Sequence, residues 1–108
     1  MAEIIIQPLV HYKLTKLLKA IHHVKYFATK EGAKQYVNLL VAFINNIPNE
    51  RSRKTKFKTH GGLYCVFKPN KKTSYYITFD KKDDRFIIKN FFNNHSSDYP
   101  LFISGKSL

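Results

Sequence analysis

The stretch that decides the fold is residues 61–92, GGLYCVFKPNKKTSYYITFDKKDDRFIIKNFF. It holds three short runs rich in β-branched and aromatic residues, at 63–67, 75–79 and 86–92, a composition typical of strands. The breaks at 69–72 and 80–84 carry Pro, Asn and Asp, which favour tight turns. This spacing predicts an antiparallel meander of three strands, opened by a turn at Gly61 and Gly62.

Two amphipathic helices are predicted upstream of the meander. The apolar stripe of the first is Leu14, Leu17, Leu18, Ile21 and Val24, a spacing that places all five on one helical face. This helix is predicted to end near residues 27–28, with Lys13, Lys16 and Lys19 facing water. A second helix is predicted to begin at the N-cap Thr29 and to be stopped by residues 45–49, because Pro48 disfavours helical geometry in the residue before it.

The start of the chain adds one more element. Residues 3–7, EIIIQ, form a β-branched run closed by Pro8, which predicts a short strand. A polar, basic segment at 50–61 leaves room for a further short strand at 53–59. The predicted fold is α+β, with a helical hairpin packed on an antiparallel meander sheet in the order β-α-α-β-β-β. Residues 1–108 then form a single domain, which at this length buries one core without disulfides.

The charge balance narrows the class of partner. The chain has 19 Lys and Arg against 7 Asp and Glu, a net charge of +12. Such a surface attracts a polyanion or an acidic protein, although solubility through net charge is the alternative. The single cysteine, Cys65, lies in an apolar run, which indicates a buried structural thiol and a reducing compartment. Without a basic leader or a run of about 20 apolar residues, we expect a cytoplasmic protein that does not span a membrane.

Basic residues are densest between positions 51 and 72, and no acid occurs between Glu50 and Asp80. We expect these cations to gather on one face beside the C-terminal tail and to bind nucleic acid, with affinity that falls steeply with salt. The predicted nucleic-acid-binding residues are Arg51, Arg53, Lys54, Lys56, Lys58, Lys68, Lys71 and Lys72. The interleaved aromatics Phe57, Tyr64, Phe67, Tyr75 and Tyr76 can stack on unpaired bases. A place in the sheet core is the favoured interpretation for them, since alternate strand residues point inward.

Four segments in this order resemble the RelE/ParE superfamily of bacterial type II toxins. They are GAKQYVNLLVAFINNIPN (32–49), GGLYCVF (61–67), SYYITFD (74–80) and FIIKNFFNNHSSDYP (86–100), and the resemblance extends over about residues 3–103. It implies a toxin whose partner is an acidic antitoxin, partly disordered when free. The RelE branch implies an endoribonuclease that cleaves mRNA at the ribosome, and the ParE branch implies a non-catalytic inhibitor of DNA gyrase. A plain basic nucleic-acid-binding module is the third alternative.

Cleavage of RNA in the RelE manner implies neither a metal nor a small-molecule cofactor. A neighbouring 2′-hydroxyl attacks the phosphate, so the protein supplies an acid, a base and cations that stabilise the added charge. The resemblance points to His95 and Tyr99 in the tail, with His60 as a further candidate across the sheet. An incidental surface histidine is the alternative interpretation of His95. The family's cationic strand positions correspond here to Cys65, Phe67 and Tyr76, none of them cationic, which weakens the nuclease hypothesis.

Overall fold

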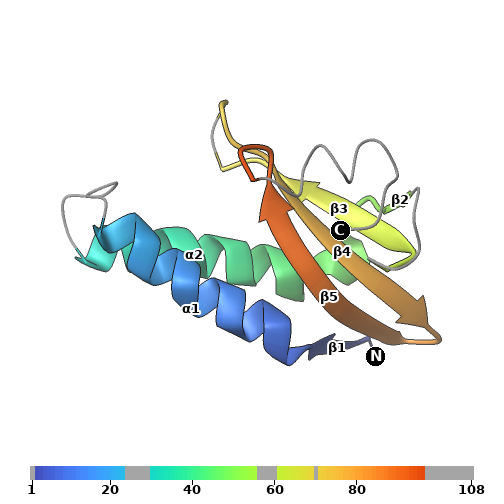
Figure 1. Cartoon of the computed structure of the whole chain (residues 1–108). Coiled ribbons are helices and arrows are strands. Elements are labelled where there is room, and N and C mark those ends of the chain that lie inside the picture. Colours follow the sequence, from blue (N-terminus) through green and yellow to red (C-terminus); the bar gives the residue numbers. More distant parts are fainter. Residues whose placement is uncertain (1, 24–29, 56–60, 70, 97–108) are drawn as a thin grey trace.

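The computed structural model describes residues 2–23, 30–55, 61–69 and 71–96, and the statements below concern those residues. The elements along the chain (Figure 1) are β1 (Glu3–Ile6), α1 (Pro8–His23), α2 (Lys30–Asn45), the 3-10 turn η1 (Ile47–Asn49), β2 (Arg53–Lys54), β3 (Leu63–Phe67), β4 (Tyr75–Lys82) and β5 (Arg85–Asn93). The predicted α+β order is confirmed, and β2 lies at the start of the segment 53–59 where a further short strand was allowed for. The predicted N-cap Thr29 and the predicted end of the first helix lie outside the described residues.

The five strands form one sheet in the order β1-β5-β4-β3-β2. Strands β3, β4 and β5 make the predicted antiparallel meander. Strand β1, however, pairs in parallel with β5, with Ile4 opposite Phe86 and Ile6 opposite Ile88. The sheet is therefore mixed and not wholly antiparallel as predicted. Parallel strands need a long crossover connection, and both helices lie between β1 and β5 along the chain.

The hairpin between β4 and β5 is tighter than predicted. Strand β4 continues to Lys82, and the turn is confined to Asp83 and Asp84, with Asp83 at a φ of 55°. The predicted break at 80–84 was thus too wide. Asp80 lies within the strand, where one carboxylate oxygen accepts a hydrogen bond from the Gly62 N–H at 2.6 Å and the other lies 3.0 Å from the Lys89 ammonium. The prediction was too wide because a run of polar residues in the sequence resembles a loop even when their side chains have partners in the sheet.

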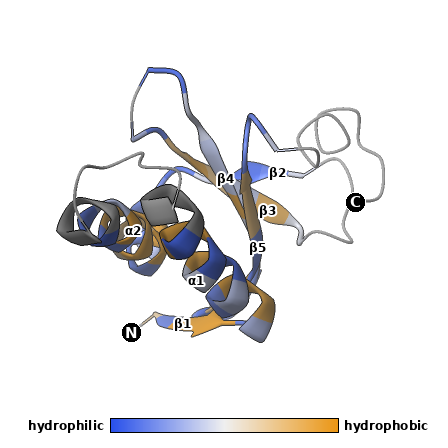
Figure 2. Cartoon of the chain, turned by 60° about the vertical axis from the view of Figure 1, so that its left-hand side comes forward, coloured by the Kyte–Doolittle hydropathy of each residue, from blue (hydrophilic) through white to orange (hydrophobic). Residues whose placement is uncertain are grey.

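The core lies between the two helices and one face of the sheet (Figure 2), and the apolar sides of the helices turn toward it. Its most deeply buried members are Val10 from α1, Leu40 and Ile44 from α2, Ile47, and Cys65, Ile77, Phe79 and Ile88 from the sheet. Because strand side chains alternate between faces, Tyr64, Val66, Tyr76, Thr78 and Phe92 belong to the opposite face, which we call the distal face. The helices thus cover only one face of the sheet.

Cys65 is buried as predicted, with 1% of its surface exposed. Burial, and to a smaller extent the charge of Glu50, raises the pKa of its thiol to about 11. The thiolate is the nucleophilic form of cysteine, so this side chain is a neutral part of the core.

Lys13 was predicted to face water, but it is partly buried against β5. Its ammonium donates to the Asn90 Oδ1 at 2.5 Å and to the Phe91 carbonyl at 3.1 Å. Strand β1 is paired with β5 only as far as Ile88, and backbone groups beyond that point need other partners. Asn90 also accepts from the Phe91 N–H at 2.9 Å. Lys13 therefore supplies a hydrogen-bond donor to the part of β5 that β1 does not pair with. Lys16 and Lys19 are exposed as predicted.

Candidate nucleic-acid interface

Two arginines and a tyrosine meet at the β2 edge of the sheet. Arg53 in β2 is paired with Tyr64 in β3, and directly opposed residues of an antiparallel pair share a face. A hollow of about 140 Å³ opens there, lined by Glu50, Arg51, Arg53, Tyr64 and Val66. Both arginines are exposed. We call Arg51 and Arg53 the arginine edge.

The glycine pair holds the arginine edge in place. Thr55, which follows β2, donates its N–H to the Gly62 carbonyl at 3.1 Å and its hydroxyl to the Gly61 carbonyl at 2.6 Å. Gly61 has a φ of 107°, and a β-carbon there would lie 2.9 Å from the backbone N and O of Phe79. Only glycine combines that backbone conformation with so close an approach to β4. The predicted turn signal thus has a specific task, which is to fix the connection that carries β2.

Neither arginine of the edge forms an ion pair with a described acid. Ion pairs in the described ranges join Arg85 to Glu3 at 3.3 Å and Lys89 to Asp80 at 3.0 Å. Glu50, the acid in the hollow, accepts a hydrogen bond from the Asn46 side chain at 2.9 Å. Guanidinium groups outside ion pairs can bind phosphate oxygens through two parallel hydrogen bonds. The charge and shape of this edge suit a phosphate group.

Aromatic rings line the distal face next to the arginine edge. The ring centroids of Tyr64 and Tyr76 are 6.2 Å apart, and those of Tyr76 and Phe92 are 6.0 Å apart. The two tyrosines are partly exposed. The predicted core position is confirmed for Tyr75, which is 3% exposed, and for Phe67, which packs against the core. The alternation around buried Cys65 was the signal that could have placed Tyr64 and Val66 on the distal face.

A second basic group lies in the turn between β3 and β4. Lys68, Lys71 and Lys72 are all exposed there. Asn94 braces this turn, because its side chain accepts from the Ser74 N–H at 2.9 Å and donates to the Lys72 carbonyl at 3.2 Å.

His95 lies beside this second basic group. It is exposed, and its Nε2 is 3.4 Å from the hydroxyl of Thr73. The β3–β4 turn therefore places a histidine next to a segment that carries Lys71 and Lys72.

The described cations thus fall into two groups and not the single cluster that we expected. Arg53 is paired near the start of β3, whereas Lys68 follows its end, roughly 13 Å away at the usual rise per strand residue. Lys54 is adjacent to Arg53 in β2, so its side chain projects toward the other face. The remaining site predictions, His60, Tyr99, Lys56, Lys58 and Phe57, lie outside the described residues.

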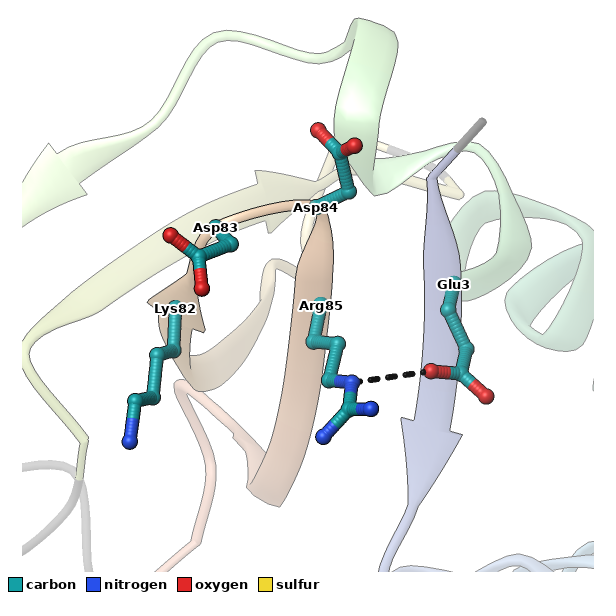
Figure 3. A pocket seen from close by; sticks show the side chains of 5 residues that line it. All are labelled: Glu3, Lys82, Asp83, Asp84 and Arg85. Atoms are coloured by element: carbon teal, nitrogen blue, oxygen red, sulfur yellow. Dashed lines mark ion pairs between the residues drawn. The ribbon is translucent and has the colours of Figure 1, made fainter.

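A larger hollow, of about 450 Å³, lies beside β1 and the β4–β5 turn (Figure 3) and is lined by Glu3, Lys82, Asp83, Asp84 and Arg85. Arg85 is already paired with Glu3, and the Glu3 N–H donates to the Asp84 carbonyl at 2.7 Å. Three carboxylates against two cations disfavour an anionic ligand here. This hollow is therefore not the candidate site.

No helix within the described residues has the length and apolar character needed to cross a membrane.

Comparison with family models, with curated proteins and with solved structures found no match to this chain.

Proposed function

We propose that this chain binds RNA and that the arginine edge holds the phosphates. The observation that carries the proposal is the hollow lined by Arg51, Arg53 and Tyr64, with no ion pair from either arginine to a described acid. Each phosphate neutralised by such a cation releases counterions, which drives binding at low salt. The net charge of +12 adds long-range attraction for the same partner.

The resemblance to the RelE/ParE superfamily supports a finer proposal. In it, the chain is a toxin of a type II toxin–antitoxin system that cleaves mRNA at the ribosome in the cytoplasm. The 2′-hydroxyl oxygen attacks phosphorus as it loses its proton, and the departing 5′-oxygen gains one. His95 is the candidate acid or base, and Lys71 and Lys72 are the candidate cations for the added charge. An acidic antitoxin would neutralise the toxin by binding its basic surface and folding there.

RNA binding is tested with a double variant and a charge-matched control. Arg51→Ala/Arg53→Ala removes two cations from the arginine edge, and Lys34→Ala/Lys82→Ala removes two exposed cations elsewhere. In fluorescence anisotropy with labelled RNA, the first should lose about tenfold or more in affinity, and its log–log salt slope should fall by about 1.4. The control should lose less than about threefold, by long-range attraction alone. Equal losses for the two variants would show that only net charge matters.

The toxin proposal needs its own experiments. Purified protein added to translating ribosomes should give cleaved mRNA, and His95→Ala should slow cleavage by about tenfold or more. Inhibited DNA supercoiling with intact RNA would favour the gyrase inhibitor instead. Salt-sensitive RNA binding without growth arrest on expression would leave the plain binding module. Growth arrest that an adjacent acidic reading frame rescues would support the toxin–antitoxin pair.

A further inference from the structure

The aromatic row of the distal face crosses three strands. Tyr76 in β4 is paired with Phe92 in β5, and their rings are stacked with an interplanar angle of 24°. Tyr64 in β3 lies diagonally from Tyr76 at a tilt of 49°. Phe92 is only 4% exposed and stacks beside Tyr76 from the neighbouring strand, whereas Tyr64 and Tyr76 are partly exposed. The sheet thus presents two rings whose positions are set by strand pairing.

The arginine edge and this row are neighbours. Arg53 is paired with Tyr64 across β2 and β3, a separation of about 5 Å between backbones. A polymer whose phosphate is bound by Arg53 would therefore place the group next to that phosphate over Tyr64. In single-stranded RNA that group is an unpaired base, whose π-face stacks on aromatic rings. In a duplex the base faces are covered by neighbouring pairs and cannot reach the sheet.

We propose that the distal face binds single-stranded RNA, with Tyr64 and Tyr76 stacking on unpaired bases and the arginine edge holding the adjacent phosphates. The inference rests on the RNA binding proposed above and adds its substrate class. The negative charge of RNA complements the cations of the edge, and its bases complement the rings. An acidic peptide would match the charge but offers no unpaired base to stack on the two rings.

The test compares a single strand of about 12 nucleotides with a duplex of the same length. Wild-type protein should prefer the single strand by about tenfold or more. Tyr64→Leu and Tyr76→Leu should each weaken single-strand binding by about fivefold or more, at one stacked base per ring, and change duplex binding less than about twofold. Tyr12→Leu is the control, because Tyr12 is 56% exposed on α1, away from the distal face.

A second variant covers the possibility that the leucine variants do not fold. The chain contains no tryptophan, so Tyr76→Trp keeps an aromatic ring and introduces a single fluorophore. Its emission should be quenched by the single strand and not by the duplex. Emission unchanged by a saturating single strand would overturn the inference.

The outcomes separate this inference from the proposed function. If Arg51→Ala/Arg53→Ala weakens RNA binding but the tyrosine variants weaken single strand and duplex equally or not at all, RNA binding stands and the stacking face is wrong. If the arginine variant has no effect, the proposed function itself fails. Tyrosine-dependent binding of polyglutamate in place of RNA would overturn the inference in favour of an acidic protein.

Discussion

Replacing Gly61 with alanine should lower the free energy of unfolding of this domain and also loosen the arginine edge. Two costs add at this position. The φ of 107° is strained for any residue with a β-carbon, which costs about 1–3 kcal/mol. The new methyl group would also lie 2.9 Å from the Phe79 backbone N and O, and forcing such an overlap apart costs about 1–3 kcal/mol. Because Phe79 belongs to a central strand, the neighbour cannot easily move.

The expected loss is therefore about 2–6 kcal/mol, out of a total of about 5–15 kcal/mol for a domain of ordinary stability. At about 4 °C or more per kcal/mol, the melting temperature should fall by at least about 8 °C. Gly62→Ala is the matched control. The nearest atom to its β-carbon is the Asp80 Oδ1 at 3.4 Å, so its loss should stay below about 1 kcal/mol.

Urea denaturation followed by circular dichroism gives both free energies of unfolding, and RNA anisotropy at low temperature reports on the arginine edge. Because Gly61 and Gly62 anchor Thr55 and hence β2, folded Gly61→Ala protein should also bind RNA more weakly than folded Gly62→Ala protein. Equal stabilities of the two variants, or a larger loss for Gly62→Ala, would refute the reasoning.

Three further predictions concern single side chains. Lys13→Met should cost about 1–3 kcal/mol in urea denaturation, because it leaves a β5 carbonyl without its donor, whereas the exposed Lys16→Met should cost less than about 0.5 kcal/mol. Partial burial raises the pKa of Asp80, but a backbone hydrogen bond and Lys89 more than offset this, so the folded-state pKa lies below its usual value. The stability from Asp80 is then present above the unfolded-state pKa of about 4 and is lost as the pH falls through the folded-state value. Asp80→Asn should therefore be less stable than wild type near neutral pH, and the difference should vanish in acid; a difference independent of pH would contradict this. Cys65, with its pKa raised to about 11, should resist thiol reagents in the native protein at about pH 8 and react on unfolding; rapid labelling of the folded chain would contradict its burial.

Local pattern was sufficient for the elements and for much of the core. The alternation in 63–67 and 75–79 predicted strands, and a stripe at helical spacing predicted the first helix, because the period of apolar residues depends only on local backbone geometry. The burial of Cys65 followed from the same pattern. The density of basic residues after Glu50 was also visible in the sequence, and it led to the arginine edge.

Tertiary structure alone decided which elements meet. Nothing in EIIIQ distinguishes a parallel partner from an antiparallel one, and nothing near Lys13 indicates that its ammonium completes the edge of β5. The meeting of Arg53 with Tyr64, eleven positions later in the chain, depends on β2 folding back along β3. The same pairing divided the basic run into two groups at the two ends of β3. A periodic sequence specifies which side of an element is apolar. The partner that covers that side is chosen by packing among segments far apart in the chain. Complementarity of shape and hydrogen bonding between those segments exists only in the assembled fold.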